Sequence, residues 1–238
     1  MPTVMSNRSK IIGAAVAGLM CASASAAPEN ITDGELALTP KYCQDVQGIR
    51  YGDAFFNKSP RADYWVGMMG KSFWALHHYC WALINLRRSQ AAGVTAQVRR
   101  GLIENVVADC FYVIKNSTPD FILLPEIYTR IGDAEMMLSN PGAAYEAYTM
   151  SRKIKPDYWP PYARWADVLV KINQKAEAKA LLAEGLRNVP DAKPLIDQYR
   201  ALGGDPSKIV PIVKAPKPEP PPAESSSPAS SAASATSS

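Results

Sequence analysis

Apolar residues recur with a helical period through the middle of the chain. The clearest example is a face with apolar residues at i, i+3, i+4 and i+7: Tyr162, Trp165, Ala166 and Leu169. The stretch that follows carries a matching face: Ala178, Leu182 and Gly185. The small side chains of Ala166 and Ala178 let two helix axes approach closely. The pattern therefore predicts an antiparallel pair of helices, with a turn at residues 172–174.

The same helical hairpin occurs a second time, earlier in the chain. Residues 125–158 align without a gap on residues 159–192, and their closing prolines, Pro156 and Pro190, are 34 residues apart (190 − 156). Tyr128 and Ile131 correspond to Tyr162 and Trp165, and Gly132 corresponds to Ala166. A fixed period of this length is typical of stacked helical repeats, each of which buries its apolar face against its neighbours.

The period, the pattern of two bulky residues followed by a small one, the alanines of the second helix and the closing prolines together resemble the tetratricopeptide repeat (TPR). The resemblance implies an all-α solenoid of about three antiparallel helical hairpins plus a C-terminal covering helix. Its repeats would span residues 68–120, 125–158 and 159–192, within a helical domain of residues 68–204. The covering helix would span residues 193–204. Two residues depart from the family pattern, Glu135 and Ser151.

Two adjacent histidines interrupt this pattern in the stretch FWALHHYCWAL, residues 73–83. His77 and His78 have the spacing of Trp165 and Ala166, which predicts the first helix of an atypical first repeat, over Met68 to Arg88. His78 then takes the slot of Gly132 and Ala166. A buried imidazole in such a slot needs a hydrogen bond.

The alternative is a metal- or cofactor-binding site centred on His77, His78 and Cys80. A histidine and a cysteine three residues apart can share a transition metal. Further ligands would have to come from Cys43, Cys110 or carboxylates, and the chain has no CxxCH, HExxH or paired CxxC motif. The sequence therefore favours no metal, no cofactor and no enzymatic activity, with the histidine cluster as the competing interpretation.

The two ends of the chain have their own character. Basic residues, an apolar run and small residues up to Ala26 predict a signal peptide over residues 1–26, with lipidation at Cys21 as an alternative. Residues 27–67 form an N-terminal cap segment in this interpretation. Residues 205–238 are rich in Pro, Ser and Ala, which predicts a disordered tail whose proline-rich half is extended.

An exported chain meets an oxidising compartment, so its cysteines can pair. Cys43 lies in a segment without repeat register, and a bond from Cys43 to Cys80 would tether that segment by closing a loop of 37 residues (80 − 43). This pairing is favoured, and Cys80 with Cys110 is the alternative. The chain is predicted to be periplasmic or secreted, and no later segment is long and apolar enough to span a membrane.

The resemblance also implies a binding groove on the first helix of each repeat. It selects seven residues: Glu126, Thr129, Asp133, Met136, Ala163, Asp167 and Val170. This surface is mildly acidic. Loss of Arg8 and Lys10 with the signal peptide lowers the formal charge from +4 to +2, which gives no strong attraction to nucleic acid. We therefore expect a non-enzymatic adaptor or assembly factor for an envelope-associated complex, whose partner is a protein or an extended peptide.

Overall fold

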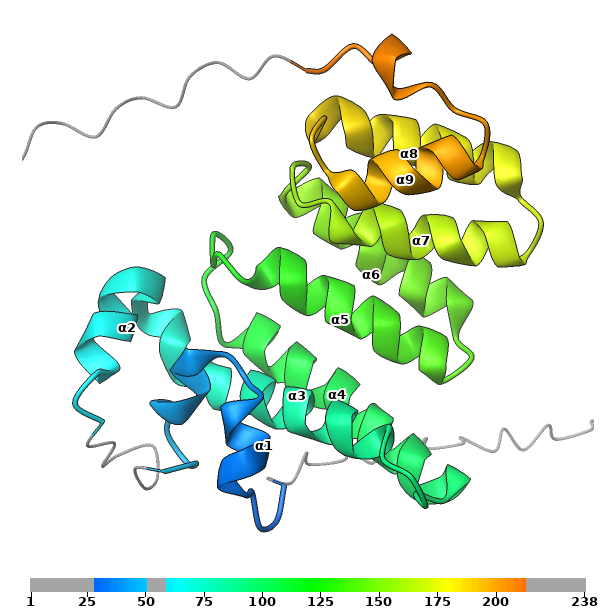
Figure 1. Ribbon diagram of the computed structural model, residues 1–238. Coiled ribbons are helices and arrows are strands. Elements are labelled where there is room, and N and C mark those ends of the chain that lie inside the picture. The colour runs from blue at the N-terminus through cyan, green and yellow to red at the C-terminus, as the bar shows by residue number, and fades with distance from the viewer. Residues whose placement is uncertain (1–27, 51–58, 213–238) are drawn as a thin grey trace, which may run out of the picture.

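The computed structural model describes residues 28–50 and 59–212, and every regular element in these ranges is helical (Figure 1). The α-helices are α1 (Asp33–Ala37), α2 (Ala62–Met69), α3 (Leu76–Ser89), α4 (Ala96–Lys115), α5 (Leu124–Met137), α6 (Pro141–Ile154), α7 (Pro160–Lys171), α8 (Lys175–Asn188) and α9 (Lys193–Ala201). Three 3₁₀ turns cover Lys41–Gln44, Gly70–Ala75 and Pro206–Lys208. The predicted signal peptide, Cys21 and the tail from residue 213 onward lie outside the described residues.

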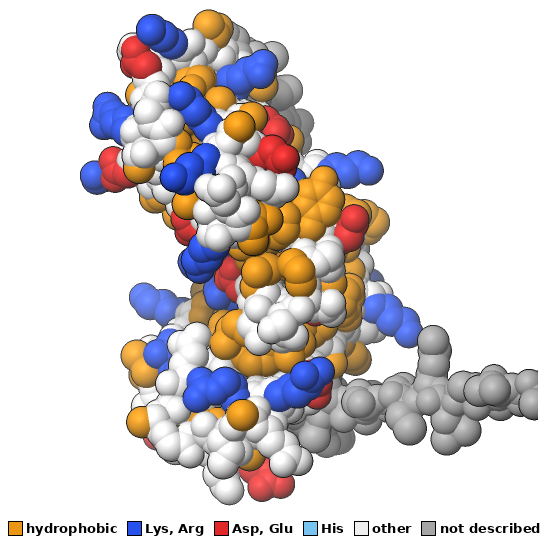
Figure 2. Space-filling view, turned by 90° about the vertical axis from the view of Figure 1, so that its right-hand side faces the viewer, with side chains coloured by type: hydrophobic (Ala, Val, Ile, Leu, Met, Phe, Trp, Pro, Cys, Tyr) orange, Lys and Arg blue, Asp and Glu red, His pale blue; other side chains and the backbone are white. Residues whose placement is uncertain are grey.

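Helices α3 to α8 form three antiparallel hairpins stacked one on another, with α3, α5 and α7 in one layer and α4, α6 and α8 in the other (Figure 1). In a view onto the turns of the hairpins, hydrophobic side chains fill the seams between neighbouring hairpins and Lys and Arg side chains lie on both flanks (Figure 2). Each hairpin therefore buries its apolar surface against the next one, as stacked helical repeats do.

Close approach within the second hairpin depends on one glycine. A Cβ added at Gly132 in α5 would lie 2.6 Å from the ring of Tyr148 in α6. Gly185 in α8 has the same role in the third hairpin, where a Cβ would lie 2.8 Å from Leu195 and 3.0 Å from Tyr162. These contacts explain why the repeat pattern places a small residue opposite each large aromatic ring.

The first hairpin differs from the single helix predicted over Met68 to Arg88, so that prediction is wrong. Helix α2 ends at Met69, and the chain then turns at Gly70, which has φ of +65°, a value that glycine adopts without strain. The 3₁₀ turn that follows is held to the loop after α4, because Ser72 Oγ accepts a hydrogen bond from the Thr118 backbone N–H at 3.0 Å. Helix α3 begins only at Leu76.

An N-terminal segment, residues 28–50, packs on α3. A disulfide joins Cys43 to Cys80, the pairing favoured from the sequence. Glu35 forms an ion pair with Arg88 at 2.5 Å, and this hydrogen-bonded guanidinium lowers the pKa of Glu35 to about 2. Among the residues that the structure describes, no further hairpin precedes α3, and this segment covers that end of the stack.

A polar cluster around Asp45 connects the N-terminal segment to residues 59–65, at and before the first half of α2. The buried Asp45 carboxylate accepts hydrogen bonds from Ser59 Oγ and from Trp65 Nε1, both at 2.7 Å, and pairs with Arg61 at 3.0 Å. Helix α2 is therefore joined to the N-terminal segment through a buried charge as well as through apolar contacts.

The other end of the stack is covered by α9, whose Leu195 is fully buried against α7 and α8. The chain continues past the predicted tail boundary at residue 205. It forms the 3₁₀ turn Pro206–Lys208, packs Ile209 on the core and donates a hydrogen bond from the Ile212 N–H to the Arg187 carbonyl at 2.7 Å. The described chain therefore leaves the stack at the C-terminal end of α8.

Candidate functional site

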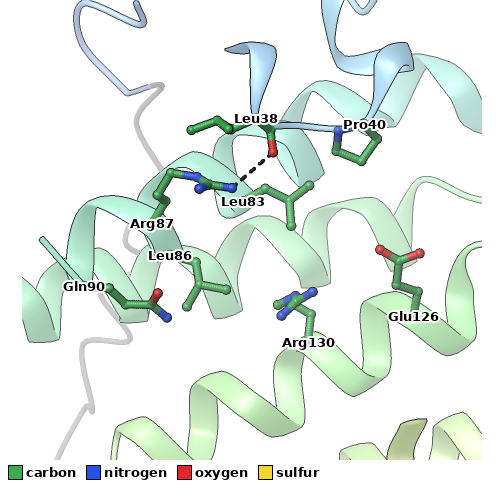
Figure 3. Close-up of a pocket in the computed structure, with 8 residues that line it drawn as sticks. All are labelled: Leu38, Pro40, Leu83, Leu86, Arg87, Gln90, Glu126 and Arg130. Atoms are coloured by element: carbon green, nitrogen blue, oxygen red, sulfur yellow. Dashed lines mark hydrogen bonds between the residues drawn. The ribbon is translucent and has the colours of Figure 1, made fainter. Parts of the chain in front are cut away.

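A groove runs across the faces of α3, α5 and α7 and consists of three adjoining hollows. The first, of about 380 Å³, lies between the N-terminal segment, α3 and α5, where Leu38 and Pro40 face Leu86, Glu126 and Arg130 (Figure 3). The second, of about 410 Å³, lies between α5, α7 and α9. The third, of about 310 Å³, extends to the C-terminal ends of α3, α5 and α7. Arg130 lines all three hollows, so they form one continuous groove.

Corresponding positions of the two regular repeats supply the charges of this groove. Arg130 and Asp133 lie three residues apart on α5, and Arg164 and Asp167 lie 34 residues later on α7. Residues three apart share one face of a helix. The 34-residue repeat therefore places an arginine and an aspartate side by side on each of two neighbouring helices, and all four line the groove.

Asp133 is the centre of the charge network. It pairs with Arg130 on its own helix at 3.3 Å, and its other oxygen lies 3.6 Å from Arg164 Nε on α7. Tyr148 of α6 donates a hydrogen bond to the same carboxylate at 2.9 Å, and burial together with this carboxylate raises the pKa of Tyr148. Asp133 is thus fixed by three partners, whereas the side chain of Arg164 remains 58% exposed and can reach a ligand.

Both ends of the groove are also held by hydrogen bonds. Tyr79 of α3 donates to Glu126 at 2.7 Å, and Gln198 of α9 donates to Asp167 at 2.7 Å. Burial acts to lower the pKa of the Arg130 guanidinium, but Tyr79 and Asp133 outweigh it and raise that pKa above its ordinary value. The groove therefore presents fixed charges of both signs along its length.

Most of the residues selected from the sequence line this groove. Six of the seven do so: Glu126, Thr129, Asp133, Met136, Ala163 and Asp167. Val170 does not; it packs instead against the core of α7 to α9. The expected acidic character is wrong, because Arg130 and Arg164 line the same surface. Arg130 lies three residues before Asp133, and Arg164 lies three residues before Asp167. One helical turn back from each selected aspartate would therefore have identified both arginines.

The histidines lie in the interface between α3 and α4. The Nδ1–H of His78 donates to the buried Asp109 carboxylate at 2.6 Å, and its ring stacks on Tyr112 with centroids 3.6 Å apart. The Nδ1–H of His77 donates to the Trp74 carbonyl at 2.9 Å. The hydrogen bond that a buried imidazole needs at position 78 is therefore supplied by α4.

The chemistry of the cysteines near these histidines is restricted. The sulfur of Cys80 is bonded to Cys43, so it is not a thiolate ligand. Cys110 is fully buried, and burial raises the pKa of its thiol well above the ordinary range. Within residues 28–50 and 59–212, no group of three His, Cys, Asp or Glu side chains is arranged to hold a metal ion. Both histidines thus make hydrogen bonds and ring contacts at the interface of α3 and α4.

No helix in the described part of the chain is long and apolar enough to cross a lipid bilayer. Comparison with models of protein families, with curated proteins and with solved structures gives no match to this chain.

Proposed function

We propose that this chain is an exported, non-enzymatic TPR-type module that binds an extended segment of a partner protein in the groove across α3, α5 and α7. In this proposal it acts as an adaptor or assembly factor for an envelope-associated complex. The observation that carries the proposal is the recurrence of an Arg–Asp pair at the same position of two repeats, on one continuous groove.

The assignment of α5 to α8 as two TPR-type repeats rests on agreement between sequence and packing. The 34-residue offset relates α5 to α7 and α6 to α8. Gly132, at a position where the repeat pattern asks for a small residue, is in close contact with the ring of Tyr148. Helix α9 covers the last hairpin, as a terminal capping element of a repeat array does.

An extended peptide suits this groove better than a compact small molecule. The three hollows follow one another across three helices, and each is lined by both apolar and charged side chains. An extended chain can place successive side chains in successive hollows. Fixed charges of both signs favour a mixed-charge segment and disfavour one with a run of like charges.

Export is supported by the cysteines and by the N-terminal sequence. The Cys43–Cys80 disulfide persists in oxidising compartments such as the bacterial periplasm or the cell exterior. The first 26 residues have the charge and apolar pattern of a signal peptide. A partner that shares this compartment is therefore proposed.

A peptide selection with charge-swapped variants tests the proposal. The full mature chain selects peptides from a random library, and the affinity of the selected peptides is then measured by calorimetry. In the variant R164D/D167R the groove keeps its net charge but exchanges the two signs. We expect this exchange to weaken binding by at least about tenfold, since misplaced charges cost on the order of 1.4 kcal/mol or more.

The matched control is the charge swap R100E/E104R on α4, where Arg100 and Glu104 form an exposed ion pair at 2.9 Å outside the groove. This control should leave the affinity unchanged. Equal losses in both variants, or no loss in either, would contradict binding in the groove. Thermal unfolding of both variants checks that the fold is retained.

A further inference from the structure

One end of the groove has a distinct composition. The 410 Å³ hollow is bounded by Tyr158 and Trp159 in the connection from α6 to α7, by Pro160 at the start of α7 and by Pro194 near the start of α9. We call this part of the groove, between those four residues, the aromatic end. Tyr158 is half-buried, and burial together with the Glu126 carboxylate raises its pKa to about 12, so its hydroxyl stays protonated and able to donate. The aromatic end thus combines flat apolar walls with hydrogen-bond donors.

This combination is suited to a proline-rich segment. Polyproline II helices dock in grooves lined with aromatic side chains, since the stiff helix loses little entropy on binding and leaves its carbonyls free to accept hydrogen bonds. The same hollow also contains the charges of Arg164 and Asp167. The chemistry therefore favours a proline-rich segment that carries both a basic and an acidic residue.

The chain itself contains such a segment immediately after the described residues. Residues 213–224 read VKAPKPEPPPAE, in which Lys217 and Glu219 alternate with prolines. Lysine complements Asp133 and Asp167, and glutamate complements Arg130 and Arg164. The remainder of the tail, residues 225–238, is made of Ser, Ala, Pro and Thr and has no charged residue. Only residues 213–224 of the tail therefore match the groove in charge.

The point where the described chain ends lies within reach of the aromatic end. The N–H of Ile212 is hydrogen-bonded to the carbonyl of Arg187, and Pro194 follows Arg187 by seven residues. Seven residues span at most about 25 Å, even when fully extended. The segment 213–224, at about 3.1 Å per residue in polyproline II form, is about 37 Å long. This length exceeds the upper limit on the separation between Arg187 and Pro194, so the segment can reach the aromatic end from Ile212.

We infer that residues 213–224 bind in the aromatic end of the groove of the same molecule and compete there with the partner peptide. The inference rests on the proposed function, because it assigns a regulator to the same groove. A tethered segment has an effective concentration on the order of 1 mM, so even an intrinsic dissociation constant near 0.1 mM would weaken partner binding about tenfold. A partner peptide then occupies the groove only if its binding is strong enough to displace residues 213–224.

Site-specific cross-linking tests the location. In the full mature chain, Trp159 is replaced by the photoreactive residue p-benzoylphenylalanine, and the cross-linked positions are mapped by mass spectrometry. We expect cross-links to residues 213–224 in material of monomer mass. The control places the same residue at Phe111 on α4, which is 50% exposed and outside the groove. Tail cross-links that are no more frequent from position 159 than from 111, or that occur only in dimers, would overturn the inference.

A second measurement tests the competition without altering the groove. The variant P216G/P218G/P220G keeps all charged residues of the segment but removes its preference for an extended form. The affinity of library-selected peptides should rise about fivefold to tenfold, whereas P228G, in the uncharged part of the tail, should change nothing. An unchanged affinity in the triple variant overturns self-occupancy but leaves the proposed function standing. Failure of both full chains to select any peptide overturns the proposed function instead.

Discussion

The first hairpin and the two that follow it are built on different principles. Hairpins α5–α6 and α7–α8 obtain their close packing from small residues set against large rings, as at Gly132 and Tyr148. The α3–α4 interface instead buries histidines and an aspartate, and a hydrogen bond joins His78 to Asp109 there. The second hairpin also has a hydrogen bond between its helices, from Tyr148 to Asp133. The first hairpin differs because it places an imidazole and a carboxylate in the position where the second has a glycine against a ring.

The difference follows from position in the stack. A middle hairpin has a neighbour on both sides, so a repeated apolar pattern is enough to bury both surfaces. The first hairpin has a neighbour on one side only. Its other side is covered by the N-terminal segment, which has no repeat pattern and is attached by a disulfide, an ion pair and a buried carboxylate. The terminal repeat is therefore joined to the segment that covers it by specific bonds in addition to apolar packing.

Removal of the disulfide is expected to have the largest effect on stability. Replacing both cysteines in C43S/C80S removes a cross-link across 37 residues, which should lower the free energy of unfolding by on the order of 3–4 kcal/mol. Urea unfolding measures the loss. Hydrogen exchange should show that residues 28–50 lose protection while α5 to α8 keep theirs.

The control for this prediction is the unpaired thiol in the variant C110A, which leaves the N-terminal segment attached and should leave its hydrogen-exchange protection unchanged. Loss of protection spread evenly over all three hairpins in C43S/C80S would contradict the separation of the chain into a tethered end and a regular stack.

The next effect is a pH dependence confined to the first hairpin. Burial, together with the neighbouring His78, lowers the pKa of His77 to about 4, below the value of about 6.5 in an unfolded chain. The unfolded state therefore binds more protons between these two values, and stability falls as the pH falls. The full loss corresponds to about 3 kcal/mol, of which about 2 kcal/mol should appear between pH 7 and pH 5.

Urea unfolding at pH 7, 6 and 5 measures how steeply the free energy of unfolding falls with pH. The variant H77Q carries no titrating group at this position, so its stability should vary less over the same range. A slope that is the same in H77Q and in the parent chain would show that the acid sensitivity arises elsewhere.

A smaller effect is expected where the regular hairpins depend on shape. Gly132→Ala places a methyl group 2.6 Å from the Tyr148 ring, and overpacking of this kind should cost about 1–3 kcal/mol. Gly101→Ala in α4 is the matched control, since a Cβ there meets no atom within 4 Å. That change should instead stabilise the chain by about 0.5–1 kcal/mol. Calorimetry measures the unfolding temperature of both variants. A change in the same direction in both would contradict the account.

The same contrast explains what could be predicted from the sequence. The hairpins of residues 125–192 follow from a repeated pattern, and the Cys43–Cys80 pairing follows from a lone cysteine in a segment that lacks such a pattern. The break at Gly70 could not be foreseen, because the contact that holds the turn joins Ser72 to Thr118, far along the chain. The Asp45 cluster depends on contacts with Ser59 and Trp65 that have no local signal.

Prediction of the groove was limited in a different way. The selected stripe included Asp133 and Asp167 but omitted Arg130 and Arg164, which lie three residues before them and line the same groove. Val170 was included by the same rule, although the end of α7 turns it toward the core. The repeat pattern was enough to predict where the groove lies. Predicting the charges that line it required knowledge of how the neighbouring helices pack.

The central claim is that partner peptides bind across α3, α5 and α7, and methyl NMR of methionines tests it most directly. Met136 and Met137 line the groove, whereas Met150, 38% exposed on α6, lies outside it. In a titration of the methyl-labelled full chain with a library-selected peptide, we predict that the resonances of Met136 and Met137 shift and that of Met150 does not. A shift of Met150 with Met136 and Met137 unmoved would place the peptide on the other layer and contradict the account.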